Sequence, residues 1–286
     1  MGTHYGAFTK RQRPKLLVIN ASAFSQGNWN LTDEVYLRKW IDNMPMSQNK
    51  LDTVETIPKN INKDDEEVKD NISDTLYFPL EKYHGNWKDP EAVYTSFVTR
   101  AYMRLSGGGY LKGFYSKTGI TGGRDNLANI GQPTKEAYVL TDECRAYLKE
   151  LLSYCNKLGI EHVLLLQPPH ETQAADKSGL EQIESITKAY GYDFLDLSTD
   201  YESIAGIDDS HDFADFEHLN AYGAKKLTAY IGNMAVNQYG IKSDTAKSEL
   251  SIWKKSVKRT KKALKMAREY TDRGEAQVVG EYEAAK

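Results

Sequence analysis

The stretch DECRAYLKELLSYCNKLGIEHVLLLQ, residues 142–167, carries a helical pattern, a glycine and a strand pattern in succession. Apolar residues recur at helical spacing over 142–157, and Gly159 follows where a helix is expected to end. The run at 162–167 is short and almost wholly apolar, which is typical of a strand buried in a parallel sheet. This stretch therefore predicts one helix–strand unit of a layered fold.

The same alternation continues on both sides of this stretch. Toward the C-terminus the pattern predicts a helix over 178–190, a strand over 193–197 and a helix over 221–237 that Asn220 caps. Toward the N-terminus, PKLLVIN at 14–20 predicts a further buried parallel strand, followed by a helix over 32–43. Strands that alternate with helices are typical of a parallel sheet covered on both faces, so we expect an α/β protein.

Two segments depart from this pattern. Residues 44–132 are irregular apart from a helical stretch near 91–105, and we interpret them as a helical and irregular insertion within a domain that spans 1–240. Residues 241–286 form a C-terminal extension with a basic amphipathic helix and a tail. One interpretation of this helix is a solvated basic face, and binding to an anionic polymer or surface is the alternative. In the first interpretation the helix packs through Trp253, Val257, Leu264 and Met266.

Bulk properties exclude several classes of protein. The chain has 286 residues and a formal net charge of -3, so its overall field gives no reason to expect nucleic acid as a partner. No window reaches the roughly 20 apolar residues of a membrane span, and the first residues lack the apolar core of a signal peptide. Cys144 and Cys155 fall in one expected helix, about 16 Å apart, so they cannot form a disulfide with each other.

The stretch DFADFEHLNAYGAKK, residues 212–226, carries the strongest chemical signal. His218 follows Asp215 by three residues, immediately before the expected helix, and one tight turn can bring both side chains to the same centre. An imidazole activates a hydroxyl nucleophile best when a carboxylate fixes its tautomer. We therefore expect Asp215 to orient His218 as a general base and acid. The alternative is a histidine that only hydrogen-bonds its neighbours at a helix start.

Metal and nucleotide chemistry find less support in the sequence. A catalytic zinc site needs three converging ligands, and the chain has no HExxH motif and no paired cysteines. The glycines in SGGGY and TGITGG lack the spacing of a phosphate-binding loop and are expected to form turns. The sequence thus predicts no metal and no cofactor. The residues near the motif that would otherwise suit a metal are His211, Asp212, Asp215, Glu217 and His218.

The block DFEHLNAYGAKKLT resembles the final block of the SGNH (GDSL-like) hydrolase superfamily, in which Asp-x-x-His closes a Ser-His-Asp triad. Further blocks, in the same order, are similar to a subgroup of cell-envelope proteins related to the D-alanyl-lipoteichoic acid biosynthesis protein family: PKLLVINASAF, RKWIDNMPMSQNK, FPLEKYHGNW, YLKGF, VLLLQPP and DFLDLS. The resemblance covers roughly residues 10–255. It implies a three-layer sandwich with a mainly parallel sheet, an esterase or O-acyltransferase activity, and a membrane-anchored place outside the cytoplasm.

The chain departs from this family at its start. Relatives begin with a strand that ends in Gly-Asp-Ser or Gly-Ser-Ser and carries the nucleophile, and no such block is found. PKLLVIN is similar to a later strand of the family, so the fold is expected to lack its first strand or strands. Either an N-terminal part that holds the nucleophile and a membrane anchor is absent from this chain, or the chain is a divergent form.

Four other residues are candidates for the site. Asn20 and Ser22, in NASAF after the first expected strand, are expected to line the cleft or donate hydrogen bonds to an oxyanion. Two alternatives stay open: both residues only cap the strand and turn, or Ser22 substitutes as the nucleophile. His84 and Trp87, in KYHGNW, are expected to line the cleft, with a structural loop histidine as the alternative.

The function expected from the resemblance is attack of a serine on acyl esters of cell-envelope polymers or carbohydrates, through an acyl-enzyme. The Asp–His pair indicates that the fold descends from enzymes with this activity. The missing nucleophile block favours a non-catalytic binding or scaffold domain for this chain, and an intracellular esterase is a third alternative. The expected partner is an acyl ester or envelope polymer, not nucleic acid, and a membrane is expected only through an N-terminal anchor.

Overall fold

The computed structural model describes residues 13–25, 41–42, 44, 46–60, 76–77, 88–91, 94, 97–98, 101, 111, 114–120, 140–169, 177–215, 218–242, 250–280 and 283–284. The chain forms two compact units. The first comprises Met1–Val93, Ala137–Leu166 and Asp176–Phe194, and the second comprises Tyr94–Glu136, Gln167–Ala175 and Leu195–Lys286. The helix predicted over 32–43 lies almost wholly outside the described residues.

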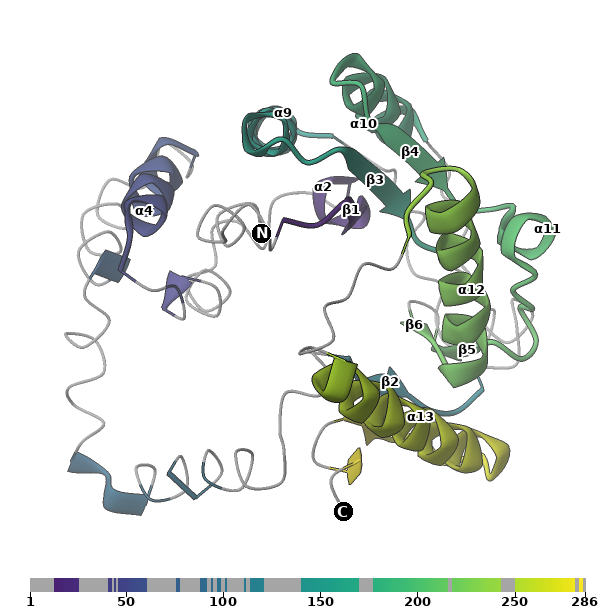
Figure 1. Ribbon diagram of the computed structural model, residues 1–286. Helices are drawn as coiled ribbons and strands as arrows, with labels where there is room; N and C mark the ends of the chain where they lie inside the picture. The colour runs from purple at the N-terminus through teal and green to yellow at the C-terminus, as the bar shows by residue number, and fades with distance from the viewer. Residues whose placement is uncertain are drawn as a thin grey trace. The chain divides into compact units, whose positions relative to one another are not determined.

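A small sheet has the strand order β1-β3-β4, where β1 is Leu16–Asn20, β3 is His162–Gln167 and β4 is Asp193–Asp196. The first unit holds β1, β3 as far as Leu166 and β4 as far as Phe194. β1 and β3 run parallel, and the arrows of β3 and β4 point the same way (Figure 1). The predicted α/β class with a parallel sheet is therefore confirmed. The strands begin and end within two residues of their predicted bounds.

Two helices of this unit begin and end within one residue of their predicted bounds. α9, Asp142–Leu158, begins at Thr141, whose side chain accepts a hydrogen bond from the Cys144 amide, and ends at Gly159 with a φ of 66°. The connections from β1 to β3 and from β3 to β4 step in the same direction, and right-handed crossovers of this kind place both helices on one face. Accordingly, α9 contacts α10, Ser178–Ala189, and both contact α2, Ser22–Ser25. This unit also contains α4, Gln48–Asn60.

Burial differs between the central and the edge strand of this sheet. Every residue of β3 from Val163 to Gln167 is buried, as the apolar run predicts. In β1 only Leu17 and Ile19 are buried, while Val18 and Asn20 are exposed. The prediction of a buried parallel strand is therefore confirmed for the pairing of β1 and for the burial of one of its faces, but not for the other face.

The second unit combines helices with two short antiparallel ribbons. β5, Phe213–Asp215, pairs with β6, His218–Leu219, and this hairpin leads directly into α12, Ala221–Asn237. β2, Ser116–Lys117, pairs with β7, Val278–Val279. Figure 1 shows α12 in green and the long helix α13 in yellow-green. The unit also contains α11 and α13, whose bounds are Tyr201–Ala205 and Leu250–Asp272.

α13 packs differently from the prediction. Its buried residues are small, namely Ser256, Ala263, Ala267 and Thr271. Ala263 and Ala267 join Ala221 of α12 and Val279 of β7 in one cluster, because small side chains let the backbones approach closely. Of the residues predicted to pack, Leu264 and Met266 do contact this cluster, but Trp253 and Val257 are 47% and 49% exposed. Nowhere in the described residues is there a helix long and apolar enough to cross a membrane.

Candidate functional site

The hairpin of β5 and β6 places Asp215 opposite His218. The imidazole Nδ1 lies 2.7 Å from Oδ1 of Asp215. An ionised carboxylate can only accept hydrogen bonds, so this distance assigns the proton to Nδ1 and leaves the Nε2 lone pair for another partner. The structure thus brings together the two residues that the sequence analysis predicted as a pair, in the geometry of a base held by a carboxylate.

Lys117 is a third member of this site, and the sequence analysis missed it. Its Nζ lies 2.9 Å from Oδ2 of Asp215 and 3.1 Å from Nδ1 of His218. Because the Nδ1 proton faces Asp215, the ammonium donates to the carboxylate, and its approach to the ring is a contact between two donors. The three side chains are about one-third exposed, at 34%, 32% and 39% for Lys117, Asp215 and His218. Asp215 therefore receives one donor on each oxygen.

Lys117 is held in place by the C-terminal part of the second unit. The Thr118 amide donates to the Gln277 carbonyl over 2.9 Å, and the Gln277 amide donates back to Thr118 Oγ1 over 2.7 Å. The amide of Gly119, which has a φ of 106°, donates to Thr271 Oγ1 of α13. These bonds connect residues more than 150 positions apart in the chain, so no local pattern indicates where Lys117 lies.

Asn220 joins this strand to the motif. Its Oδ1 caps α12 by accepting from the amides of Tyr222 and Gly223, as predicted. Its Nδ2 donates to the carbonyls of His211 and Gly119, over 2.6 and 3.2 Å. The side chain is fully buried. One amide therefore fixes the start of α12, the turn before β5 and the strand that carries Lys117.

Gly223 allows the first turn of α12 to lie against the motif. A Cβ at this position would lie 2.5 Å from the Asp212 carbonyl oxygen and 2.9 Å from Cδ2 of Leu219. These separations are too short for any side chain. The Gly of the HLN-x-x-Gly pattern is therefore explained by close approach of the helix to the residues beside His218.

Asp212 has a structural role in this region. Its carboxylate is fully buried and accepts from Lys226 Nζ over 2.6 Å and from the Asp208 amide over 2.7 Å. Its other oxygen lies 3.1 Å from Nδ1 of His211. Hydrogen bonds from the Ser210 hydroxyl and amide lower the pKa of Asp208 in the same turn. These contacts tie the turn before β5 to α12.

The residues near the motif that would suit a metal by type do not form a metal-binding group where their positions are described. Within that part of the chain, no three His, Cys, Asp or Glu side chains are grouped so that they could hold a metal ion. Glu217 lies outside it.

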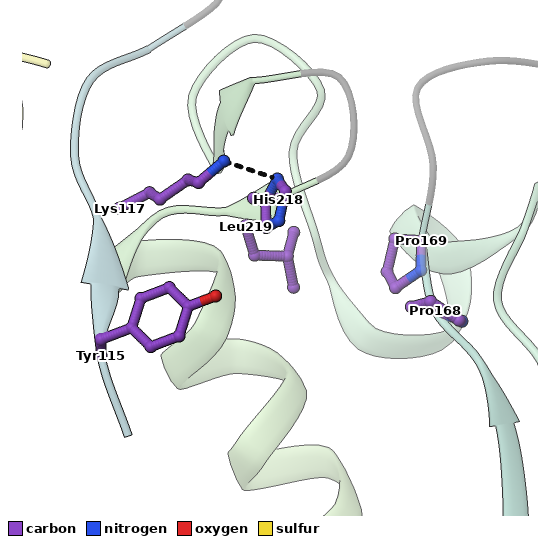
Figure 2. A pocket seen from close by; sticks show the side chains of 6 residues that line it. All are labelled: Tyr115, Lys117, Pro168, Pro169, His218 and Leu219. Carbon is purple, nitrogen blue, oxygen red and sulfur yellow. Dashed lines mark hydrogen bonds between the residues drawn. The ribbon is translucent and has the colours of Figure 1, made fainter. Parts of the chain in front are cut away.

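A pocket of about 290 Å³ opens beside the Asp–His pair. Figure 2 shows Lys117 and Tyr115 extending from one side of the pocket and two prolines, which follow β3, on the other. His218 thus lines an open space. The described lining residues are Tyr115, Lys117, Pro168, Pro169, His218 and Leu219, and no serine is among them.

Asn20 and Ser22 lie in the first unit, at the carboxyl end of β1. The Ser22 hydroxyl and amide both donate to Oδ1 of Asn20, over 2.6 and 2.9 Å. The Ser22 side chain is buried, at 8% exposure. This geometry agrees with the alternative in which the two residues cap the strand and turn. His84 and Trp87 lie outside the described residues.

Comparisons of the chain with protein-family models, with curated proteins and with solved structures found no match.

Proposed function

We propose that this chain is an SGNH-like α/β domain of the esterase or O-acyltransferase type, which acts on acyl esters of cell-envelope polymers or carbohydrates. The observation that carries the proposal is the 2.7 Å contact between His218 Nδ1 and Asp215, beside an open pocket. This pair stands immediately before α12, as the family resemblance implies. The three-layer sandwich is part of the same proposal, and the small parallel sheet supports it.

In the proposed mechanism, Nε2 of His218 takes the proton of a serine hydroxyl as its oxygen attacks the ester carbonyl. The resulting imidazolium donates this proton to the departing alcohol oxygen, and the acyl group stays on the serine. Water or an acceptor hydroxyl then attacks the acyl-enzyme with the same histidine as base, and the serine hydroxyl is restored. Asp215 holds the Nδ1 proton throughout and stabilises the imidazolium.

Lys117 is a positioning residue in this mechanism. Its ammonium donates a hydrogen bond to Oδ2 of Asp215, so the carboxylate is held with Oδ1 toward the imidazole. A carboxylate with donors on both oxygens has fewer rotamers available than one held at a single point. The lysine therefore contributes orientation, and its side chain lines the pocket.

A non-catalytic binding or scaffold domain of the same fold is the second candidate. Two observations favour it: no serine is among the described residues that line the pocket, and the Ser22 hydroxyl is engaged by Asn20. In this alternative the pocket and Lys117 bind a ligand, and the Asp–His pair only shapes the binding surface.

Labelling with a fluorophosphonate, followed by peptide mass spectrometry, separates the two candidates. The catalytic proposal predicts an adduct on one serine of the full chain, lost in His218→Gln. Turnover of a p-nitrophenyl ester should fall by a factor of about 10³ or more in the same variant, because the base is removed.

The matched control is His162→Gln. His162 also lies beside a carboxylate, with Nε2 at 3.6 Å from Glu161, but it belongs to β3 of the first unit. This variant should keep both the adduct and the turnover. Absence of any adduct in a folded wild-type chain, or equal labelling of His218→Gln, would overturn the catalytic proposal and leave the binding domain.

A further inference from the structure

The N-terminal half of α13 carries a surface that the proposed function does not use. Six residues surround a shallow hollow, and we call them the α13 patch. They recur at intervals of three and four, so they lie along one side of the helix. The residues of the α13 patch are Leu250, Trp253, Lys254, Val257, Lys258 and Lys261.

Three large apolar side chains of the patch face solvent. Leu250, Trp253 and Val257 are 41%, 47% and 49% exposed. The buried residues Ser256 and Ala263 of α13 lie on a different side of the helix. Contiguous exposed apolar side chains of this size mark a surface for interaction.

All charged side chains of the α13 patch are positive. No Asp or Glu occurs between Leu250 and Arg268. In the described portion of the chain, the ammonium groups of Lys254, Lys258 and Lys261 form no ion pair. The stems of these lysines lie beside the apolar side chains, so their charged ends are available to a partner that is both anionic and apolar beneath its surface.

We propose that the α13 patch binds the surface of an anionic lipid bilayer, with α13 lying in the plane of the interface. A polyanion alone would engage the lysines but would bury none of Leu250, Trp253 and Val257. A bilayer with anionic headgroups offers both components, since tryptophan favours the interface and lysine stems extend from the acyl region to the phosphates. Each lysine near such a surface adds to the affinity through its charge.

This inference is independent of the proposed esterase or acyltransferase function. It also differs from the expectation that only an N-terminal anchor would bring the chain to a membrane. The α13 patch would hold the second unit at a membrane surface by itself, with an affinity that falls as salt screens the lysines.

Vesicle co-sedimentation of the full chain tests the proposal. The chain should bind phosphatidylcholine vesicles that contain phosphatidylglycerol, and bind pure phosphatidylcholine weakly. Replacement of Lys254, Lys258 and Lys261 by Gln should weaken binding on the order of 100-fold, because three favourable charges are lost. Brominated lipid should quench the fluorescence component that Trp253→Phe removes.

The matched charge control replaces Lys149, Lys157 and Lys188, which are exposed on α9 and α10, by Gln. This variant has the same net charge as the patch variant and should bind as the wild type does. Circular dichroism checks that all variants fold. Equal loss of binding in both triple variants, absence of quenching at Trp253, or patch-dependent binding to soluble polyglutamate without vesicle binding would overturn the proposal. A dimer that disappears with Trp253→Ala in the absence of lipid would overturn it in favour of self-association.

Discussion

At the scale of single residues, two glycines of α12 have opposite surroundings. A Cβ at Gly223 would lie 2.5 Å from the Asp212 carbonyl oxygen, whereas a Cβ at Gly232 would meet nothing within 4 Å. Both positions are helical, so the intrinsic gain from alanine is the same, roughly 1 kcal/mol. The difference between the two substitutions therefore isolates the close approach of α12 to the motif.

We predict that Gly223→Ala lowers the free energy of unfolding by about 1 to 3 kcal/mol, because the clash with backbone atoms outweighs the helical gain. Gly232→Ala should raise it by up to roughly 1 kcal/mol. Urea denaturation of both variants measures the difference. Equal stabilisation by the two substitutions would show that α12 does not lie as close to Asp212 as described.

At the scale of elements, α12 begins at a residue whose side chain both accepts and donates hydrogen bonds. Asn220 accepts from two amides of the helix and donates to the carbonyls of His211 and Gly119. Aspartate is usually as good a helix cap as asparagine. Here it would place a buried charge against two carbonyl oxygens that have lost their donor.

We predict that Asn220→Asp destabilises the protein by at least about 2 kcal/mol, and by no less than Asn220→Ala. The ordering of these two variants is the informative result, since capping alone would rank aspartate above alanine. Chemical denaturation near neutral pH gives both values. An aspartate variant as stable as the wild type would mean that the hydrogen bonds to His211 and Gly119 contribute nothing.

Some boundaries and contacts of these elements follow from the local sequence, and others do not. Thr141, Gly159 and Asn220 are local signals, and the helices they bound were predicted to within one residue. Lys117 was missed because the bonds that place it connect β2 to residues near β7. Leu264 and Met266 of α13 were predicted correctly to pack, but Trp253 and Val257 were not. Hydropathy gives most weight to large apolar side chains, whereas the fully buried residues of α13 are serine, alanine and threonine.

At the scale of the whole molecule, the two cysteines both belong to the first unit, so their reactivity measures the opening of that unit alone. Both lie buried in α9 of the first unit, and the second unit contains none. Burial raises the pKa of the Cys155 thiol from about 9 to about 11. The thiolate, which is the reactive form, is therefore disfavoured while the first unit is folded.

We predict that alkylation of Cys155 by iodoacetamide near pH 8 proceeds only through opening of the first unit. Because the folded pKa is the higher one, the unfolded chain loses this proton first. The contribution of Cys155 to stability is thus complete below about pH 9 and is lost as pH rises toward about 11. Comparison with Cys155→Ala in urea denaturation at several pH values isolates it. Fast alkylation of the native protein, or identical pH dependence in the two proteins, would contradict the burial described.

The bonds that fix Lys117 also set an order of events during synthesis. Thr118 is held by Glu275 and Gln277, which are 157 and 159 residues later in the chain. A ribosome adds roughly 5 to 20 residues per second, so many seconds separate the emergence of the lysine from that of its support. Asp215 and His218 emerge within this interval, so both residues of the Asp–His pair are synthesised before Lys117 can be fixed beside them.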